Sequence, residues 1–408
     1  MNIAVVVTQF PCLSETFVLN HICGLKERGH EVTIISRLRP VGEKRHPDVD
    51  HYDLLTHTRY WGEQVPASRF KRALAGMGLA LKISKGWLPR WMGGLGLIAP
   101  GTSELLFMAQ ALQGHFDIVH CHFGSNGIMA ARLKAAGLLC GKLLVNFHGQ
   151  DVNSQPFEQG NNIYEAMFRR ADALIVNSHF TRDRVIALGG LAERIVVVRE
   201  SLRVERFPFV WRKQEPGSPL IILTVGRLVE KKGHAIALEA LARFRKKFPQ
   251  EQILYWVAGD GPLREILERQ CLDLGLNEIV RFWGAVDESQ AIPLFQQAHI
   301  FLCPSVTAAN QDREGQALVV QEAQACGLPV IATRHNGIPE GMEHGITGFL
   351  VPERDPEAIV ERLAHLVAHP ELWPAMGAAG RDFVAQRFDT RLVMPHLEGL
   401  YERLVATS

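Results

Sequence analysis

A glycine and two cations stand together directly after one predicted strand. The apolar run Leu220–Val225 predicts a strand, and the segment Gly226–Gly233 follows it and precedes a helical pattern. In a parallel sheet, ligands bind beyond the carboxyl ends of the strands. Gly226 lets a phosphate approach the backbone, Arg227 offers a forked donor and Lys232 a point charge. This chemistry suits a diphosphate, although a surface loop with two solvated cations has the same composition.

Two glutamates, Glu314 and Glu322, frame a second candidate anion site. They follow the predicted strand Ile300–Cys303, with Glu314 at the end of a loop and Glu322 inside the next predicted helix. Gly315–Ala317 would form the start of that helix, where free N–H groups and the helix dipole favour a phosphate. Leu318 and Glu322 are four residues apart and share a helix face. The segment could bind an anion between two hydroxyl-accepting carboxylates, whereas an isolated pair of helix glutamates is usually solvated.

A polar loop also follows the first predicted strand, Ile3–Val7. It contains Ser14, Glu15 and Thr16 just before a helical pattern. Ser14 can cap that helix and Glu15 complements its dipole. Residue propensity is equally consistent with a plain cap and with a substrate role. The position at a strand end favours the substrate role, so we predict that this loop contacts a substrate.

Two short motifs in the first half are typical of metal sites. His120 and His122 are two residues apart but lack further ligands at suitable spacing, which favours lining or packing roles. Asp48 and Asp50 form a D-x-D pattern in a polar loop. We assign a metal to neither motif and predict no cofactor.

The elements that must position these groups alternate along the whole chain. Short apolar runs alternate with helical patterns, which predicts parallel sheets with right-handed crossovers. Linker composition near Arg199–Pro219 separates two such series. We predict an N-terminal Rossmann-like domain at 1–205, a C-terminal one at 206–385 and a C-terminal helix at 386–408. The predicted strands are Ile3–Val7, Val32–Ser36, Ile118–His120, Leu143–Phe147, Ala173–Val176, Ile195–Val198, Leu220–Val225, Leu254–Ala258, Ile279–Phe282, Ile300–Cys303 and Pro329–Ala332.

The composition is that of an ordinary globular protein. The 408 residues suffice for two domains, and 44 basic against 43 acidic residues leave a net charge of +1, so nothing global favours nucleic acid. The N-terminus has no signal peptide pattern, and no stretch approaches the ~18 apolar residues of a membrane span. The seven scattered cysteines fit free thiols in a cytoplasmic protein. We leave the oligomeric state open.

One stretch departs from this composition. Residues 64–103 contain no acidic residue, but contain six basic residues and two tryptophans among aliphatic side chains: Arg69, Lys71, Arg72, Lys82, Lys85, Arg90, Trp87 and Trp91. Such a segment suits the anionic surface of a membrane. A solvated helix pair packed on the N-terminal domain is an equally good interpretation.

The loop and the glutamate pair together resemble the retaining glycosyltransferases of family 4. That family has a G-R-L-x-x-x-K-G loop and an E-x7-E segment followed by E-A-x-A-x-G-x-P-V. Here the second motif reads Glu314…Glu322-Ala323-Gln324-Ala325-Cys326-Gly327-Leu328-Pro329-Val330. The first loop, with F-P-x-x-S-E-T-F, resembles the subgroup that builds bacterial exopolysaccharides of the colanic-acid and amylovoran type. Gln316-Ala317 replace a common Phe-Gly, and Glu200-Ser201-Leu202-Arg203 replace a common Asn-Gly-Val-Asp-like turn.

The resemblance implies two Rossmann-like domains facing across a cleft, the GT-B fold, with the C-terminal helix returning to the N-terminal domain. It implies donor roles in which Arg227 and Lys232 hold the diphosphate, Glu314 contacts the transferred sugar and Glu322 accepts the ribose hydroxyls. The donor set is completed by Gly226, Gly259, Trp283, Val286, Gly315, Gln316, Ala317 and Leu318. The turn Phe147-His148-Gly149-Gln150-Asp151 resembles the family's H-G-x-D, so His148 is expected to bind the donor sugar and Asp151 to help form the acceptor loop.

The implied reaction is transfer of a hexose from a UDP- or GDP-sugar to a glycan or lipid-linked acceptor, with retention and without a metal. The expected location is the cytoplasm, with peripheral contact at the inner face of the membrane. Two alternatives remain at this point. A nucleotide-sugar epimerase shares the fold, and a sugar-nucleotide-binding or scaffold protein would need no catalysis.

Overall fold

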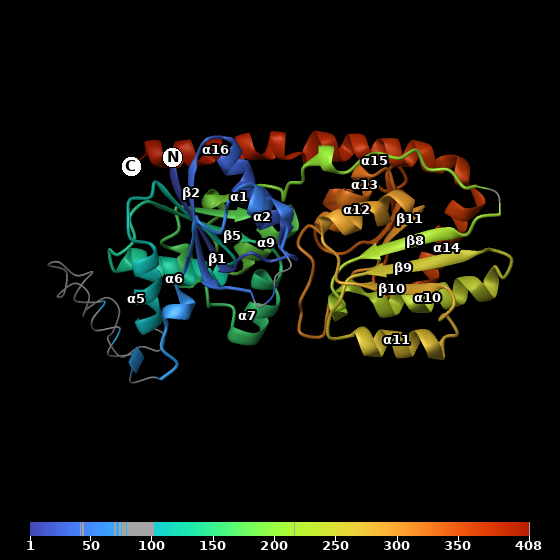
Figure 1. Ribbon diagram of the computed structural model, residues 1–408, viewed down its shortest axis with the longest axis horizontal. Coiled ribbons are helices and arrows are strands. Elements are labelled where there is room, and N and C mark those ends of the chain that lie inside the picture. Colours follow the sequence, from blue (N-terminus) through green and yellow to red (C-terminus); the bar gives the residue numbers. More distant parts are fainter. Residues whose placement is uncertain are drawn as a thin grey trace.

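The chain folds into two α/β domains, each built on one parallel sheet (Figure 1). The computed structural model describes residues 1–40, 42, 45–68, 71, 72, 75, 79, 102–215 and 217–407. Within these residues the N-terminal sheet has seven strands in the order β3-β2-β1-β4-β5-β6-β7, and the C-terminal sheet has six in the order β10-β9-β8-β11-β12-β13. The strands of the N-terminal sheet are β1 (Asn2–Gln9), β2 (Glu31–Leu38), β3 (Thr58–Tyr60), β4 (Ile118–His122), β5 (Lys142–Phe147), β6 (Ala173–Val176) and β7 (Ile195–Val197). Those of the C-terminal sheet are β8 (Leu220–Val225), β9 (Ile253–Ala258), β10 (Val280–Gly284), β11 (Ile300–Cys303), β12 (Val330–Thr333) and β13 (Gly348–Val351).

Helices cover both faces of each sheet, which explains why the central strands are nearly continuous apolar runs. Residues 3–7 of β1, for example, are fully buried. The helices around the N-terminal sheet are α1 (Thr16–Glu27), α2 (Pro47–His51), α5 (Thr102–Ala111), α6 (Gly124–Ala135), α7 (Ser154–Gln159), α8 (Glu165–Phe168) and α9 (His179–Ala187). Those of the C-terminal domain are α10 (His234–Lys247), α11 (Arg264–Asp273), α12 (Glu288–Gln297), α13 (Leu318–Ala325), α14 (Pro356–Ala368) and α15 (Trp373–Arg387).

The strand order in each sheet determines where a ligand can bind. β1 lies between β2 and β4, and β8 lies between β9 and β11, so each sheet changes its direction of strand addition beside its first strand. In open parallel sheets the binding crevice forms at that point, beyond the carboxyl ends of the strands. The loops that follow β1, β5, β8 and β11 contain the predicted site residues, and they meet between the two domains.

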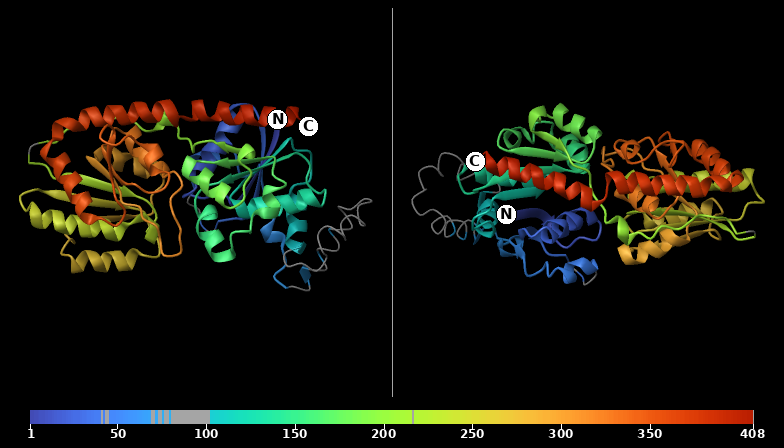
Figure 2. Two further views of the ribbon diagram at one scale, coloured as in Figure 1. Left: turned by 180° about the vertical axis from the view of Figure 1, so that it is seen from behind. Right: turned by 90° about the horizontal axis from the view of Figure 1, so that it is seen from above.

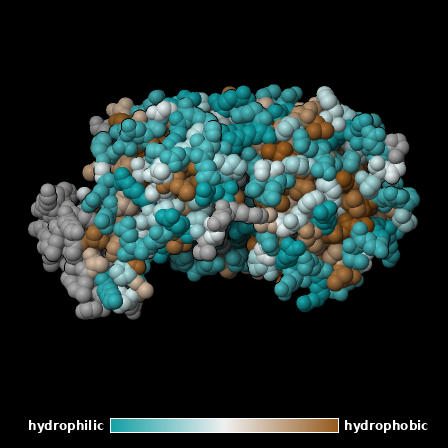
Figure 3. All heavy atoms as spheres, viewed as in Figure 1, coloured by the Kyte–Doolittle hydropathy of each residue, from teal (hydrophilic) through white to brown (hydrophobic). Residues whose placement is uncertain are grey.

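The last helix, α16 (Thr390–Ala406), returns to the N-terminal domain. Its buried side chains Met394, Leu397, Leu400 and Tyr401 belong to the same core as β1 and α1. Figures 1 and 2 show α15 and α16 running along one side of the molecule across both domains. On the side opposite these helices the outline is indented between the domains (Figure 3). Polar and apolar residues are interspersed over the face that this figure shows. The predicted fold, two Rossmann-like domains across a cleft with a returning C-terminal helix, is confirmed.

The sequence prediction omitted two short edge strands, β3 and β13, because runs of three and four residues show little periodicity. The remaining predicted strands are present, with bounds that differ by a few residues. The strands of the two sheets are separated by the stretch between Val197 and Leu220, which contains the predicted domain boundary.

The predicted membrane segment, 64–103, lies largely outside the described residues, so its membrane contact stays a prediction. Within the part of the chain that the structure describes, no helix is both long enough and apolar enough to cross a bilayer.

Candidate active site

A cavity of about 420 Å³ opens between the two domains and brings most of the predicted site residues together. Its N-terminal wall comes from the loops after β1, β4 and β5 and from Glu200, and its C-terminal wall from the loops after β8, β9, β10 and β11. The predicted site residues that line it are Ser14, Glu15, Thr16, His148, Gly226, Arg227, Lys232, Gly259, Val286, Glu314, Gly315, Gln316, Ala317, Leu318 and Glu322.

The cationic loop after β8 owes its shape to close backbone contacts. Gly233 has φ of +67°, and a Cβ there would lie 1.9 Å from the carbonyl oxygen of Pro304. A Cβ on Gly259 would lie 1.9 Å from the carbonyl oxygen of Gly226. Only glycine allows these approaches, so the loops after β8 and β9 pack backbone to backbone. As a result Arg227 and Lys232 both face the cavity.

Lys232 and Glu314 form an ion pair in the cavity wall. The distance from Lys232 Nζ to Glu314 Oε1 is 2.8 Å, and both side chains are largely buried. Burial raises the pKa of Glu314, but the charges of Lys232 and Lys231 outweigh this effect and lower its pKa to about 2. The carboxylate is therefore ionised at neutral pH and can accept hydrogen bonds from hydroxyl groups.

The backbone around Glu314 is fixed by a second pair of side chains. The Glu314 N–H donates to Nε2 of His335 at 3.1 Å, and His335 Nδ1 lies 2.7 Å from Glu353 Oε1. The next residue, Gly315, lies so close to the N-terminal domain that a Cβ would sit 1.7 Å from the carbonyl oxygen of His148. The domains therefore touch at the point where the resemblance places the transferred sugar.

The N-terminus of α13 points into the same cavity. Ala317 precedes the helix in the left-handed conformation, with φ of +59°, and no side chain caps the helix. The first N–H groups of the helix thus remain available to an anion, and the dipole favours negative charge there. Leu318 and Val319 of this first turn line the cavity.

Glu322 faces the cavity from the next turn of α13. Desolvation, and then the neighbouring carboxylate of Glu288, raise its pKa to about 8. Glu288 is in turn held by Arg206, whose Nη1 lies 3.4 Å from its Oε1, and by His46, whose Nε2 lies 3.5 Å away. Without a ligand, Glu322 therefore carries a proton at neutral pH, which a ribose hydroxyl can accept as a hydrogen bond.

Gln316 joins the two domains. Its side-chain amide donates to the carbonyl oxygen of Glu200 and accepts from the Glu200 N–H, both at 2.8 Å. The residue is 3% exposed. Gln316, which departs from the family pattern, thus bonds to Glu200 in the other segment that departs from it, and the bonds join the two domains.

His148 has protein partners for both ring nitrogens. Nδ1 lies 2.8 Å from Glu200 Oε1, and Nε2 lies 3.1 Å from His122 Nδ1. The ring also lies 4.3 Å from that of Phe17, centroid to centroid. The expected hydrogen bond from His148 to a sugar stays a prediction, and in this arrangement it requires one of these bonds to be exchanged.

The loop after β1 contributes Ser14, Glu15 and Thr16 to the cavity, but the capping interpretation is wrong. The N-cap position of α1 is Glu15, no side chain caps the helix, and Ser14 Oγ lies 3.4 Å from Cys12 Sγ. Burial raises the pKa of Glu15, and Glu15 Oε2 has no hydrogen-bond partner among the described residues. This buried oxygen lacks a hydrogen bond that a substrate hydroxyl could donate.

Two predicted site residues do not line the cavity. Asp151 is fully buried, and its carboxylate accepts from the N–H groups of His148, Gly149 and Gly124 at 3.0 to 3.2 Å. Its carboxylate therefore shapes the turn, and a contact with the acceptor stays a prediction. Trp283 packs beneath the guanidinium of Arg281, 3.7 Å from the ring centroid, whereas Val286 does line the cavity.

Sequence reasoning missed several residues of this site. Glu200 contacts His148 and Asn177, and Glu288 acts on Glu322. A third histidine, His21 of α1, joins His120 and His122 in one cluster. Only Glu200 had a signal, because it stands at a departure from the family pattern.

The fold and the cavity define a two-domain enzyme of the nucleotide-sugar glycosyltransferase class. Residues 14–206 match the family described as Glycosyltransferase Family 4, and residues 206–383 match Glycosyl transferases group 1. The chain belongs to family 4 of the glycosyltransferases, and the comparisons give the epimerase alternative no support.

Relatives of known name match along the full chain. The putative colanic acid biosynthesis glycosyltransferase WcaL of Salmonella typhimurium is 31% identical over 99% of this chain and 100% of its own length. The amylovoran biosynthesis glycosyltransferase AmsK of Erwinia amylovora is 32% identical over the same shares. The structure of Anabaena Alr3699/HepE in complex with UDP and glucose superimposes with a TM-score of 0.73 at 18% identity, covering 99% of this chain and 100% of HepE. That likeness concerns the fold.

Proposed function

We propose that the protein transfers a hexose from a UDP- or GDP-sugar to a glycan or lipid-linked oligosaccharide in exopolysaccharide biosynthesis, with retention and without a metal. One observation carries the proposal. Arg227, Lys232 and the uncapped N-terminus of α13 converge on one cavity beside an ionised glutamate, Glu314. The names of the full-length relatives support the exopolysaccharide pathway.

The donor would lie along the C-terminal wall. Its diphosphate would contact Arg227, Lys232 and the first N–H groups of α13, and its ribose would contact Glu322. The sugar would reach the interdomain contact of Gly315 with His148, where Glu314 accepts its hydroxyl groups. The base would lie against the loop that contains Val286.

The chemistry follows from where charge develops. The bond between the anomeric carbon and the diphosphate oxygen breaks, and a bond from the acceptor oxygen to that carbon forms on the same face. The acceptor proton passes to the departing diphosphate. Fixed positive groups at the diphosphate stabilise the charge of the transition state in a site of low dielectric constant.

Two observations support transfer without a metal. Arg227, Lys232 and the helix dipole already provide the positive charge that a divalent ion would supply. The D-x-D pattern is used elsewhere, because the Asp48 carboxylate accepts two hydrogen bonds from Arg206, at 2.6 and 2.7 Å.

The acceptor would lie along the N-terminal wall. The unpartnered Glu15 oxygen would accept a hydrogen bond from the acceptor hydroxyl, and Phe17 and Phe123 would offer ring faces to a sugar. A lipid-linked acceptor would place the enzyme in the cytoplasm at the inner face of the membrane.

The test is a donor and acceptor panel. The full chain is incubated with UDP- and GDP-hexoses, with and without a lipid-diphosphate-linked oligosaccharide, and nucleotide release is measured with and without EDTA. Acceptor-dependent release that EDTA leaves unchanged, with a product of retained anomeric configuration by NMR, supports the proposal. An inverted product, or loss of activity with EDTA that Mg²⁺ restores, would overturn the corresponding part of it.

A further inference from the structure

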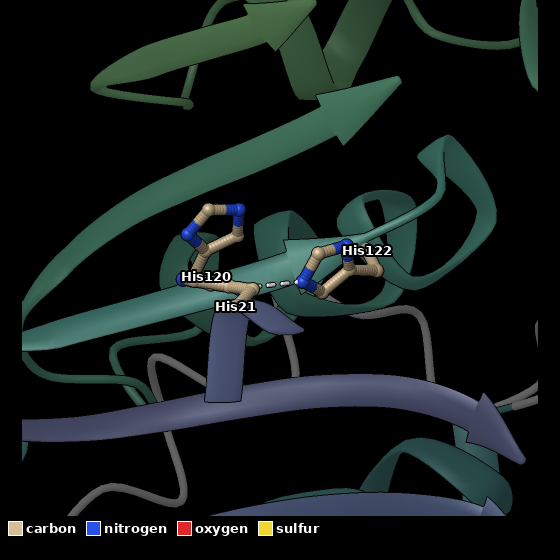
Figure 4. A group of neighbouring side chains, drawn as sticks. All are labelled: His21, His120 and His122. Carbon is tan, nitrogen blue, oxygen red and sulfur yellow. Dashed lines mark hydrogen bonds between the residues drawn. The ribbon is translucent and has the colours of Figure 1, made fainter. Parts of the chain in front are cut away.

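A continuous series of hydrogen bonds leads from the cavity into the core of the N-terminal domain. It starts at Glu200 and passes through His148, His122 and His21 to Tyr401 and His120. The successive distances are 2.8, 3.1, 2.8, 3.0 and 2.6 Å. Figure 4 shows the central part, with His21 from α1 bonded to His122 of β4 and His120 beside them. We call the four histidines with Tyr401 the histidine relay.

The relay connects four elements that are distant in sequence. His120 and His122 lie on one face of β4, His21 on the face of α1 that covers it, Tyr401 on α16 and His148 after β5. All five side chains are at most 7% exposed. Burial, and then neighbouring imidazoles, lower the pKa values of His120 and His122, and burial lowers that of His21 to about 3. Burial also raises the pKa of Tyr401, so the buried members are neutral.

With His148 also neutral, the hydrogen bonds allow one consistent assignment of protons. The Glu200 carboxylate only accepts, so His148 Nδ1 donates to it and a neutral His148 accepts at Nε2. His122 then donates from Nδ1 and accepts at Nε2, and His21 does the same. Tyr401 donates to His21 and accepts from His120 Nδ1. The last nitrogen, His120 Nε2, has no partner among the described residues, which places the single unsatisfied lone pair far from the cavity.

His148 is where the relay meets the catalytic cleft. Its carbonyl oxygen accepts from Asn177 Nδ2 at 3.0 Å and lies against Gly315 of the C-terminal domain. The imidazole is thus attached to the backbone that forms the wall next to Glu314. Among the described residues, His122 is the hydrogen-bond partner of His148 Nε2, so the protonation of that nitrogen is coupled to the residues behind it.

We propose that His122, His21 and Tyr401 are positioning residues that hold His148 as the neutral Nδ1–H tautomer, with its ring fixed at the sugar end of the cavity. The helix α16 thereby supports the active site through Tyr401. The inference rests on the proposed function, since the sugar end is defined by the proposed donor position.

A metal ion is the competing occupant of the cluster. One ligand nitrogen from each of His21, His120 and His122 lies within 4.8 Å of the others. However, His21 Nδ1 and His122 Nε2 are 2.8 Å apart, whereas two nitrogens on one tetrahedral zinc ion lie about 3.3 Å apart. Tyr401 Oη also lies between His21 and His120 at hydrogen-bond distance from both. The geometry therefore favours hydrogen bonds between these side chains over coordination of a metal ion.

The test uses the full chain and its Tyr401→Phe, His21→Leu and His21→Gln variants. Tyr255→Phe is the matched control, because it removes a buried hydroxyl that donates to Thr224 in the C-terminal domain. Histidine ring ¹⁵N shifts, assigned by single substitutions, report the tautomers. We expect His148 to carry its proton on Nδ1 alone in the wild type, and a fraction with Nε2 also protonated in Tyr401→Phe and His21→Leu.

In the transfer assay, kcat of Tyr401→Phe and His21→Leu should fall about tenfold with donor KM nearly constant, since misplacement of a site wall is costly. His21→Gln, which can donate and accept, should recover most of the activity, and Tyr255→Phe should keep it. Unchanged His148 shifts in Tyr401→Phe overturn the proposal, as does one bound zinc per chain that His21→Leu loses. If no donor is used by the wild type, the proposed function fails, while the ¹⁵N shifts still decide the tautomer assignment.

Discussion

The two walls of the cavity differ in the charge of the groups that line them. The C-terminal wall carries full charges and a helix dipole, through Arg227, the Lys232–Glu314 pair and the start of α13. The N-terminal wall presents the rings of Phe17, Phe123 and His148. Of its two acids, Glu200 is paired with His148, and Glu15 has a pKa raised by burial.

This difference matches the two kinds of substrate. A nucleoside diphosphate is an anion whose charge grows when the glycosidic bond breaks, so its wall needs fixed positive groups. A sugar acceptor is a neutral polyol, for which ring faces and directed hydrogen bonds provide specificity. The apolar N-terminal wall also lowers the local dielectric constant and thereby strengthens the charges opposite. Substitutions on the two walls should therefore impair transfer in different ways.

The largest effect is expected for Lys232→Ala on the charged wall. It removes a cation from the diphosphate and leaves Glu314 buried without its closest partner. We expect kcat/KM to fall at least about 10²–10³-fold, the usual cost of losing one such group. Steady-state release of nucleotide measures this, with the exposed Lys213→Ala as the control. A loss below threefold would remove Lys232 from the proposed mechanism.

Glu322→Gln, on the same wall, should change protein stability and nucleotide affinity in opposite directions. The Glu322 pKa of about 8 exceeds its ordinary value of 4.5, so the folded protein keeps a proton that the unfolded chain loses between these values. Stability therefore falls as the pH rises through this window, and the variant lacks that loss. We expect the melting temperature of the variant to rise relative to that of the wild type between pH 5 and pH 8. Nucleotide affinity should fall only about threefold, because the amide can still donate a hydrogen bond to the ribose.

Melting curves and nucleotide titrations at both pH values measure these two effects. The exposed Glu278→Gln should alter neither quantity. A melting difference that stays constant with pH would show that Glu322 is ionised throughout.

The charged wall could be predicted from the sequence because its parts are local. Arg227 and Lys232 follow one strand, and Glu314 and Glu322 flank one helix start, so strand order alone brings them together. The pairing of Lys232 with Glu314 was not predicted, because it depends on how closely Gly233 lets the loop approach Pro304.

The N-terminal wall could be predicted only in outline. The bond from His21 to Tyr401 spans 380 residues, and the Gln316 bonds to Glu200 span 116. No periodicity or motif encodes such pairs, since they form only when two domains and a returning helix pack. The cap, which was one of two interpretations of Ser14, is absent for a related reason, because the backbone places Glu15 at the N-cap position.

Glu15→Gln tests the neutral wall with a smaller effect. The carboxyl oxygen that has no protein partner would lose its capacity as a strong acceptor for the acceptor hydroxyl. We expect acceptor KM to rise about tenfold, the value of one hydrogen bond to a charged group, with donor KM unchanged. Donor hydrolysis without acceptor should be equal in variant and wild type. Equal losses in transfer and hydrolysis would instead place Glu15 on the donor.

Gln316→Ala should have the smallest effect, because it acts between the walls. It removes two hydrogen bonds that join the domains through Glu200, each worth about 1 kcal/mol. Since closure brings the acceptor wall onto the bound donor, weaker closure should raise donor KM severalfold and leave kcat within about twofold. Gln297→Ala, an exposed change on α12, is the control for these constants. Small-angle scattering with bound nucleotide should show a more open variant. A drop in kcat at constant KM would mean that Gln316 acts on the transition state itself and does not merely hold the walls together.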